Sequence, residues 1–355
     1  MKAARWAVLI LFFCVSSVLL GCGAADSIAS KAAPQKTITV KDSVGREVEL
    51  PYPLERVAVC NVYNAELITA VGAIDRIVGV DNYIFQDQSG FKNRFKQEQV
   101  FGISQNAMNY EKLAELAPQA VIITGNGTWQ DAQDMLDRFG IKVIVINSYY
   151  TEQFADNCRL IGKIFGREQE AAELADYFGD KLAYIQKQLQ GADRRKLYFE
   201  YRTLGKTAAP GDYFYKMVEY SGADNIFADA RGGQVDQEAI IAKDPQYIVK
   251  VADAKAYSSY VPPSLAEEKQ IKQELIGRSG WAGIDAVRHD RILLLSHYLH
   301  GGASKLVGTM YIAKFLYPEY LPDLHPEDIF RTWLEKYQGL DYVAGHSYPR
   351  FAFDD

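Results

Sequence analysis

Two glutamates stand at matching positions in two similar stretches of the chain, where a pair of carboxylates could bind a partner with two-fold symmetry. Glu111 follows Asn109 by two residues, and Glu238 follows Asp236 by two residues. Seven residues after each glutamate come Pro-Gln and a hydrophobic run. This spacing predicts one unit of turn, helix, proline and strand that is used in both halves. The helix dipole also favours an acid in a first turn, which explains either glutamate without a partner but not their equivalent placement.

Aromatic and basic residues gather in the segments that follow the predicted strands, where open α/β sheets bind small molecules. The candidate ligand contacts are Tyr63, Tyr83, Trp129, Tyr149 and Tyr150 in the first half, and Arg202, Arg231, His297, Tyr298 and His300 in the second. Lys305, at the end of the last of these segments, adds to the basic residues. An aromatic wall facing a basic wall suits a flat or apolar ligand that also carries negative charge, as ferric siderophores, heme and corrinoids do. Two alternatives stay open: single tyrosines as surface residues, and an ion pair of Arg202 with Glu200 or Asp212. No set of metal ligands is predicted.

Short hydrophobic runs alternate with amphipathic segments of helical length, which predicts α/β lobes with mostly parallel sheets. The predicted strands begin at Arg56, Arg76, Ala120, Lys142, Lys196, Gln246 and Arg291. Between the halves, apolar residues recur with the helical period at Ala171, Leu174, Ala175, Phe178, Leu182 and Ile185. This period predicts one long helix. The predicted organisation is two Rossmann-like α/β lobes, over 37–165 and 192–355, joined by an interlobe helix over 166–191.

The N-terminus has the features of a secretory signal over residues 1–21, with Lys2 and Arg5 ahead of an apolar run. The run ends in Leu-Leu-Gly-Cys, which resembles a bacterial lipobox and predicts that Cys22 becomes the lipid-bearing N-terminus. The small and polar residues that follow predict a flexible tether over 22–36. We therefore expect an extracytoplasmic protein that its lipid anchors to the cell membrane, in the periplasm or on the outer face. The alternative is an ordinary signal peptide with a chance cysteine.

The charge balance excludes some partners. Loss of residues 1–21 would leave 37 of the 39 basic residues against 45 acidic ones, a net charge of -8, which argues against nucleic acid. The remaining cysteines, Cys60 and Cys158, have no metal-binding spacing, and we expect buried free thiols. The sequence has no G-x-S-x-G, P-loop or H-E-x-x-H signature. We therefore expect a binding protein, with an envelope enzyme on the same scaffold as the rival class.

The chain resembles the substrate-binding lipoproteins of ABC importers for iron-siderophore complexes, vitamin B12 and heme. The resemblance rests on both Glu-to-Pro units and on the segments T37-I-T-V-K-D-S-V-G-R-E-V-E-L-P, P53-L-E-R-V-A-V and N64-A-E-L-I-T-A-V-G-A. It implies that a shallow cleft between the lobes takes the ligand, and that Glu111 and Glu238 dock on arginines of the permease. It further implies a monomer with no intrinsic cofactor that delivers an iron chelate to a permease dimer with its ATPase.

The ligand class and the tail remain open within this resemblance. Cobalamin, heme and an oxyanion such as molybdate or tungstate are alternatives to the iron chelate. The tail continues past the last helix usual in the family. It predicts a further amphipathic helix from about Pro326 to Tyr337, which we expect to pack on the second lobe.

Overall fold

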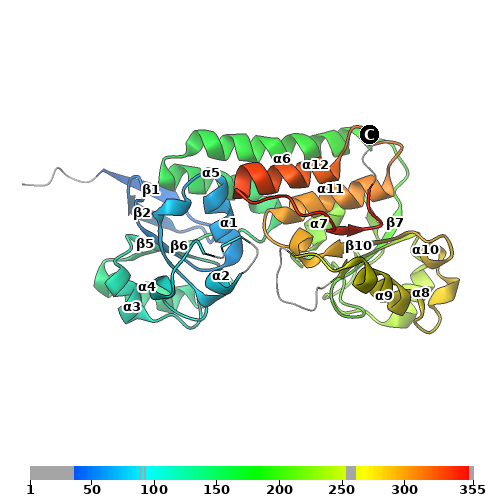
Figure 1. The fold of residues 1–355 in the computed structure, drawn as a ribbon, viewed down its shortest axis with the longest axis horizontal. Helices are drawn as coiled ribbons and strands as arrows, with labels where there is room; N and C mark the ends of the chain where they lie inside the picture. The colour runs from blue at the N-terminus through cyan, green and yellow to red at the C-terminus, as the bar shows by residue number, and fades with distance from the viewer. Residues whose placement is uncertain (1–35, 88–89, 92, 253–260, 352–355) are drawn as a thin grey trace, which may run out of the picture. The chain divides into compact units, whose positions relative to one another are not determined.

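Two parallel sheets with the same strand order form the frame of the protein (Figure 1). A computed structural model describes residues 36–351 except 88–89, 92 and 253–260, so the predicted signal peptide, Cys22 and residues 22–35 of the tether lie outside the described residues. The order is β4-β3-β5-β6 in the first lobe and β8-β7-β9-β10 in the second, where β11 adds antiparallel to β10. The strands are β3 (Val57–Val59), β4 (Ile77–Val80), β5 (Ala120–Ile123), β6 (Lys142–Val145), β7 (Lys196–Glu200), β8 (Asp224–Asn225), β9 (Tyr247–Ala252), β10 (Ile292–Ser296) and β11 (Ser347–Tyr348). The α/β class and the two similar lobes are confirmed.

The repeated unit around the two glutamates has the same structure in both lobes. Helices α3 (Tyr110–Leu116) and α8 (Gln237–Lys243) each end at a residue in the left-handed conformation, Ala117 with φ 46° and Asp244 with φ 42°. The proline that follows cannot continue a helix, because it lacks an N–H group and clashes with the preceding turn. Strands β5 and β9 then begin two residues after their prolines.

The glutamine after each proline ties the unit to the neighbouring strand. The Gln119 N–H donates to the Arg56 carbonyl at 2.8 Å, and Gln119 Oε1 accepts from the Arg56 N–H at 3.1 Å. Gln246 makes the same two bonds with Lys196, both at 3.0 Å. Because β3 and β7 begin at or next to these partners, the Pro-Gln pair fixes how each central strand starts beside its neighbour.

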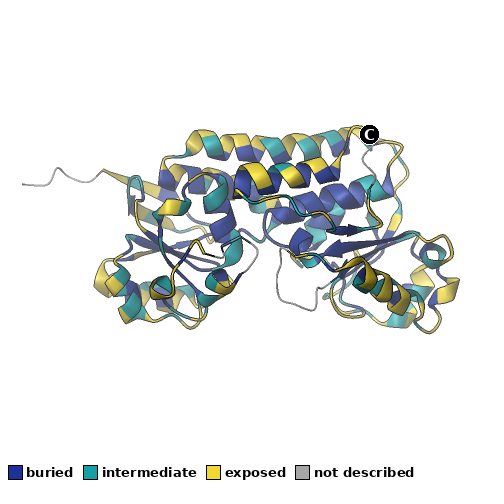
Figure 2. Ribbon diagram, in the orientation of Figure 1, coloured by how far each residue is buried: buried dark blue, intermediate teal, exposed yellow. Residues whose placement is uncertain are grey.

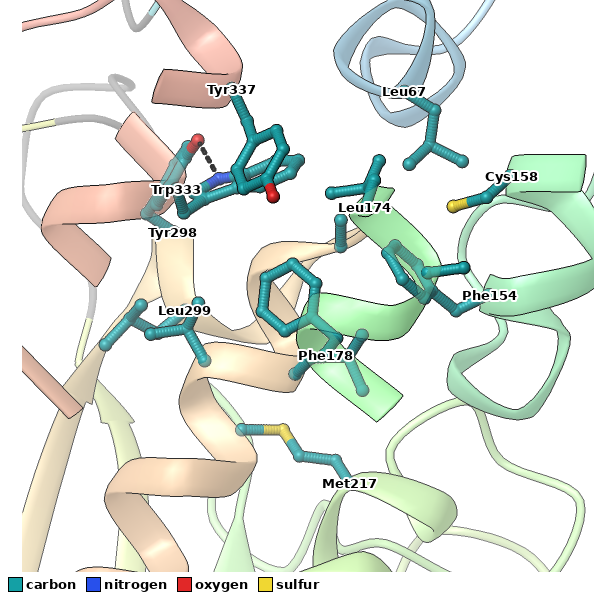
Figure 3. Packing of buried hydrophobic residues seen from close by; sticks show 14 of the residues in the cluster. Leu67, Phe154, Cys158, Leu174, Phe178, Met217, Tyr298, Leu299, Trp333 and Tyr337 are labelled. Carbon is teal, nitrogen blue, oxygen red and sulfur yellow. Dashed lines mark hydrogen bonds between the residues drawn. The ribbon is translucent and has the colours of Figure 1, made fainter. Parts of the chain in front are cut away.

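One long helix, α6 (Glu168–Gln188), connects the lobes and packs on elements of both. Its buried face is formed by five of the six apolar residues predicted for it, and Leu182 is partly buried. Figure 3 shows Phe178 of this face between Phe154 of the first lobe and Trp333 of the C-terminal segment, with ring centroids 5.3 and 5.9 Å apart. A single hydrophobic core therefore runs from one lobe into the other.

The C-terminal extension packs on both lobes, so the expectation that it packs on the second lobe alone was incomplete. It forms α12 (Pro326–Thr332) and a π-helical segment, Trp333–Gln338. Gln338 Nε2 donates to the Glu66 carbonyl in the first lobe at 3.1 Å, and Trp333 Nε1 donates to Tyr298 Oη in the second at 3.1 Å. The aromatic side chains of the extension enter the shared core, which gives the segment more apolar burial than one lobe surface would.

The remaining elements cover the sheets; most have an exposed outer face, whereas α11 is buried over nearly its whole length (Figure 2). They are the antiparallel pair β1 (Thr37–Lys41) and β2 (Glu47–Pro51), and the helices α1 (Val62–Ala70), α2 (Asn82–Gln86), α4 (Trp129–Leu136), α5 (Phe154–Phe165), α7 (Tyr215–Tyr220), α9 (Leu265–Ile276), α10 (Asp285–Arg288) and α11 (Ser304–Leu316). A 3-10 turn over His297–His300 joins β10 to the segment ahead of α11.

Candidate functional site

Two neighbouring hollows form a cleft lined by residues that follow the strands of both sheets. The first, the acidic compartment, has a volume of about 310 Å³ and is lined by Asn61, Val62, Tyr63, Glu66, Asp81, Tyr83, Asp87, Ser104, Gln105, Asn106, Thr124, Asn126, His297, Tyr298, Gly301 and Ser304. The second, the tyrosine compartment, has a volume of about 250 Å³ and is lined by Asn61, Tyr63, Asn126, Tyr149, Tyr201, Tyr213, His297, His300, Gly301 and Lys305. Five residues line both, so the compartments adjoin.

The first-lobe wall is held by hydrogen bonds at the ends of β3 and β4. Asn61 has φ 78°, and its side chain caps α1 by accepting from the Tyr63 N–H at 2.9 Å. Asp81 accepts from the Asn61 N–H at 3.0 Å and from the Ile84 N–H at 2.9 Å, which caps α2. Two strand ends and two helix starts are thereby fixed to one another, and Tyr63 and Tyr83 project from fixed backbone.

Tyr63 crosses to the second lobe and lies against two glycines. A Cβ atom at Gly301 would lie 2.4 Å from Tyr63 Oη, and one at Gly302 would lie 2.7 Å from its ring. Gly302 also has φ 49°, which favours glycine. The two glycines therefore let an aromatic side chain of the first lobe touch the backbone of the second at the middle of the cleft.

Glu66 gives the acidic compartment a neutral acid at pH 7. The residue is 4% exposed, and burial, with the nearby charge of Asp87 as a smaller cause, raises its pKa to about 8. Tyr298 hydrogen-bonds to the Glu66 carboxyl, while Glu66 Oε2 has no hydrogen-bond partner among the described residues. Glu66 was not predicted as a site residue, because a glutamate in the middle of a helix also fits an ordinary solvated face.

His300 gives the tyrosine compartment a neutral imidazole. The residue is 4% exposed, and burial, followed by the charge of His297, lowers its pKa well below the usual value. Its Nδ1 is bonded to the His297 carbonyl, and a carbonyl can only accept, so Nδ1 carries the proton. The lone pair is then on Nε2. His300 can accept a hydrogen bond from a ligand or donate this lone pair to it.

Lys305 gives the same compartment a cation. Its Nζ donates to the Tyr149 carbonyl at 2.6 Å and to the Tyr213 carbonyl at 2.8 Å. Burial lowers its pKa to about 7, and the charges of Glu152 and Asp212 oppose this shift. Lys305 ends the segment 296–305 that was expected at the cleft, where the sequence placed it in the basic wall. Its burial in the first turn of α11 was not predicted.

Comparison with known proteins identifies the family. The family model described as periplasmic binding protein matches residues 57–299, more than half of the chain. The chain belongs to the periplasmic binding protein family. It is a substrate-binding protein of the class III type that serves ABC transporters, not an enzyme.

Two sequence relatives and one solved structure are similar to the chain over most of its length. The chain is 26% identical over 339 residues to an uncharacterized ABC transporter substrate-binding lipoprotein, YvrC of Bacillus subtilis, which covers 90% of this chain and 98% of the relative. It is 23% identical to the molybdate-binding protein MolA of Haemophilus influenzae, over 92% and 97% of the two chains. The solved structure of a TroA-like periplasmic binding protein, FepB of Veillonella parvula, has a TM-score of 0.70 at 20% identity, over 87% and 99% of the two chains.

The structure of this periplasmic binding protein brings six of the ten candidate ligand contacts to the cleft. They are Tyr63, Tyr83, Tyr149, His297, Tyr298 and His300. Tyr150 does not line the cleft; its ring packs against that of Tyr149, with ring centroids 4.6 Å apart. Arg202 is exposed at the end of β7, where its carbonyl accepts from Lys250 Nζ at 3.2 Å and its charge lowers the pKa of His300 as a minor cause.

The other two candidate contacts also lie outside the residues that line the cleft. Trp129 packs on the core of the first lobe, and the Arg46 guanidinium lies 4.3 Å from its ring centroid. It begins α4, so its side chain belongs to the helix rather than to the loop after β5. Arg231 is exposed in the segment between β8 and α8. An aromatic or basic residue a few positions past a strand can thus lie outside the site, because the next helix redirects it.

The two proposed docking glutamates occupy equivalent and exposed positions. Glu111 lies in the first turn of α3 and Glu238 in the first turn of α8. Within the described part of the chain, neither carboxylate has an ion-pair partner. By contrast, Glu115, one turn further along α3, pairs with Lys112 at 2.9 Å. The equivalence inferred from the sequence is therefore also an equivalence of structure.

Other predicted features can be checked in the described residues. Cys60 and Cys158 are buried and free. Glu200, one possible partner of Arg202, is bound by Arg278 and Lys250, and Asp212, the other, is bound by Lys206 at 3.3 Å. Among residues 36–351, outside the undescribed gaps, no cluster of three or more His, Cys, Asp or Glu could hold a metal ion. A search of the same residues found no helix with the length and apolar character needed to cross a membrane.

Proposed function

We propose that this periplasmic binding protein captures an iron(III)-siderophore or a similar anionic metal chelate in the cleft and delivers it to the permease of an ABC importer. The observation that carries the proposal is the composition of the tyrosine compartment. Tyrosine side chains and a buried lysine converge there beside the neutral His300. Burial raises the pKa values of Tyr149 and Tyr213 to about 12, so both hydroxyls keep their protons and can donate at neutral pH.

The chemistry of these groups suits a chelate. Tyrosine rings offer apolar contact to the body of a small molecule, and their hydroxyls offer hydrogen bonds to its oxygens. The ammonium and the hydroxyl protons favour negatively charged or electron-rich oxygen atoms. Glu66, Asp81 and Asp87 line the adjoining compartment and offer acceptors for hydrogen-bond donors elsewhere on the ligand. A chelate with oxygen ligands around its metal and polar groups at its edge would use both compartments.

A molybdate-like oxyanion is the second candidate. The tyrosine compartment, at about 250 Å³, lies just below the usual size range of pockets for drug-sized ligands and would enclose a small anion well. MolA, a relative over nearly its whole length, is named for molybdate. Cobalamin and heme remain alternatives that would need to extend across both compartments and out of the cleft.

Titration of the purified protein separates these candidates. We expect a ferric siderophore to bind at one site per chain, measured by the change in intrinsic tryptophan and tyrosine fluorescence. We expect His300→Ala to weaken this binding by about tenfold or more, because it removes a hydrogen bond to a charged group of the ligand. Phe139→Ala, which truncates an exposed side chain remote from the cleft lining, is the matched control. If only molybdate binds, the ligand is an oxyanion and not a chelate. If wild type and His300→Ala bind the ligand equally, His300 is not part of the site.

We further infer that the mature chain begins at Cys22, that lipid on this cysteine holds it at the cell membrane on the extracytoplasmic side, and that it works as a monomer. The Leu-Leu-Gly-Cys sequence supports the anchor, as does the relative YvrC, which is named a lipoprotein. Two acyl chains or more would give stable attachment. An intact mass that matches cleavage downstream of Cys22, without lipid, would contradict the anchor.

A further inference from the structure

Lys305 is a buried lysine that contacts both lobes. It lies near the start of α11, is 1% exposed, and donates to the Tyr149 carbonyl of the first lobe and the Tyr213 carbonyl of the second. Both acceptors are neutral. A lysine ammonium has three N–H groups, so one donor is left for a further acceptor. Because Lys305 lines the tyrosine compartment, a ligand there is within reach of this third donor.

A second buried lysine shows what Lys305 lacks. Lys250 also donates to two carbonyls, those of Tyr201 at 3.0 Å and Arg202 at 3.2 Å, and it is 7% exposed. Its ammonium in addition contacts the Glu200 carboxylate at 2.9 Å. In the described part of the chain, Lys305 has no carboxylate within ion-pair distance. Buried charges are normally paired, because an isolated charge loses its hydration without compensation.

The groups around Lys305 do not include a counter-ion for its ammonium, so a ligand could supply one. The aromatic rings of Tyr213 and Phe214 lie 5.2 and 5.7 Å from its Nζ, on the side of the second lobe. The charged and titratable groups that face it are Glu152 and Asp212, which act on it from beyond ion-pair distance, Arg202, His297 and His300, and the tyrosines Tyr149, Tyr201 and Tyr213. In the described residues, Nζ thus has two carbonyl acceptors and two aromatic rings close to it, and no carboxylate within ion-pair distance.

We propose that Lys305 is the anion anchor of the cleft: its third N–H group binds one negatively charged oxygen of the ligand while the other two hold one carbonyl from each lobe. The proposal rests on the proposed function, since the ligand must occupy the cleft, and it adds the charge of that ligand and the residue that selects it. A bound anion strengthens the positive charge on Nζ and so its bonds to both carbonyls. Binding would thereby fasten the two lobes together at this point.

Charge selectivity of the unaltered protein is the first test, and it does not depend on any variant folding. The probes are ferric tricatecholate, ferric citrate and molybdate, which are anions, and an uncharged ferric trihydroxamate and cyanocobalamin, which have no net charge. We expect the best anionic probe to bind at least about 100-fold more tightly than both uncharged probes. Equal or tighter binding of an uncharged probe would overturn the anchor while leaving a binding protein for metal chelates or corrinoids in place. Binding of molybdate alone would keep the anchor and refute the chelate, and binding of no probe would count against both.

The second test removes the charge. Lys305→Met keeps the length of the side chain and is expected to weaken the best anionic probe by about 100-fold or more, with native near-ultraviolet circular dichroism. Lys187→Met, which removes an exposed lysine of α6 that lines neither compartment, is the matched control and should change the affinity by less than about threefold. Unchanged affinity in folded Lys305→Met would overturn the proposal. If that variant does not fold, the charge selectivity of the unaltered protein decides.

The dependence of affinity on pH gives a third readout. With a pKa of about 7 before the ligand binds, Lys305 is charged in a decreasing fraction of molecules as the pH rises from 7 to 9, so the dissociation constant of an anionic probe should rise by up to about tenfold per pH unit. Glu66, with a pKa of about 8, also gains charge in this range, and Glu66→Gln separates the two. We expect the slope to persist in Glu66→Gln and to vanish in Lys305→Met. A slope lost in Glu66→Gln instead would assign it to Glu66 and contradict the anchor.

Discussion

Replacement of Glu111 and Glu238 together by alanine is expected to abolish importer-dependent uptake and to leave ligand affinity unchanged. Both carboxylates are exposed in the first turns of equivalent helices, and neither has an ion-pair partner in the described residues. Their placement at one position of a repeated unit suits a permease with two-fold symmetry, which presents the same positive surface twice. Uptake of labelled ligand by cells that carry the importer, with the affinity of the purified variant beside it, measures both parts.

The control for this experiment removes two other exposed acids. Glu115 lies one turn beyond Glu111 on α3, and Glu274 lies on α9 of the second lobe. The double variant Glu115→Ala, Glu274→Ala loses the same net charge and should transport normally. Lysine at both docking positions should be worse than alanine, because attraction becomes repulsion. Normal uptake by the double alanine variant at 111 and 238 would contradict the docking role and leave both glutamates with the stabilisation of their own helices as their only explanation.

Glu200→Ala is expected to lower the free energy of unfolding by about 3–5 kcal/mol, because it leaves two buried or half-buried cations without their anion. The side chain of Glu200 has no exposed surface; it accepts from Arg278 through both oxygens at 2.8 Å, and Lys250 lies 2.9 Å away. Urea denaturation measures the loss. Glu173→Ala, which breaks the exposed pair with Lys336, is the matched control and should cost less than about 1 kcal/mol.

The contacts of Glu200 with Arg278 and Lys250 also support the cleft residue Tyr201, so Glu200→Ala should weaken ligand binding as well. Lys250 donates to the carbonyls of Tyr201 and Arg202 and also contacts Glu200, so we expect the loss of Glu200 to loosen both carbonyls. Burial opposes ionisation of Glu200, but the hydrogen bond and charge of Arg278 and the charge of Lys250 outweigh it and lower its pKa. The stability that this lowered pKa contributes is present above the unfolded value of about 4.5 and is lost as the pH falls below it. A loss below 1 kcal/mol in Glu200→Ala at pH 7 would show that the cations find other partners.

Much of the fold could be predicted because the same sequence unit occurs in both halves of the chain. The Pro-Gln pairs mark the same helix end and strand start in each lobe, since proline stops the helix and the glutamine amide binds the neighbouring strand. The apolar period of α6 also predicted which of its faces is buried. The path of the C-terminal extension could not be predicted, because its aromatic residues pack into a hydrophobic core formed by distant parts of both lobes.

The site was predicted less completely, for a physical reason. Position after a strand located the cleft residues Tyr63, Tyr149 and His300, but it also selected Trp129, which the start of α4 turns toward Arg46. Glu66 was missed as a contact because it stands inside a helix, and Lys305 was expected only as one basic residue of the cleft segments, without its burial. Their importance comes from burial between lobes, and no local pattern in one sequence reports which helical acid or base will be buried by a segment far away in the chain.

Native mass spectrometry of the protein purified from its source, with elemental analysis of the same sample, tests the central claim most directly. We expect one non-covalently bound small molecule per chain, a metal in equal amount, and a monomer. We also expect Lys305→Met, prepared in the same way and folded, to carry much less of this molecule. A protein that carries no metal chelate and is not loaded by any ferric siderophore, or a chelate retained at full occupancy by the Lys305→Met and His300→Ala variants alike, would contradict the claim that this cleft binds a metal chelate.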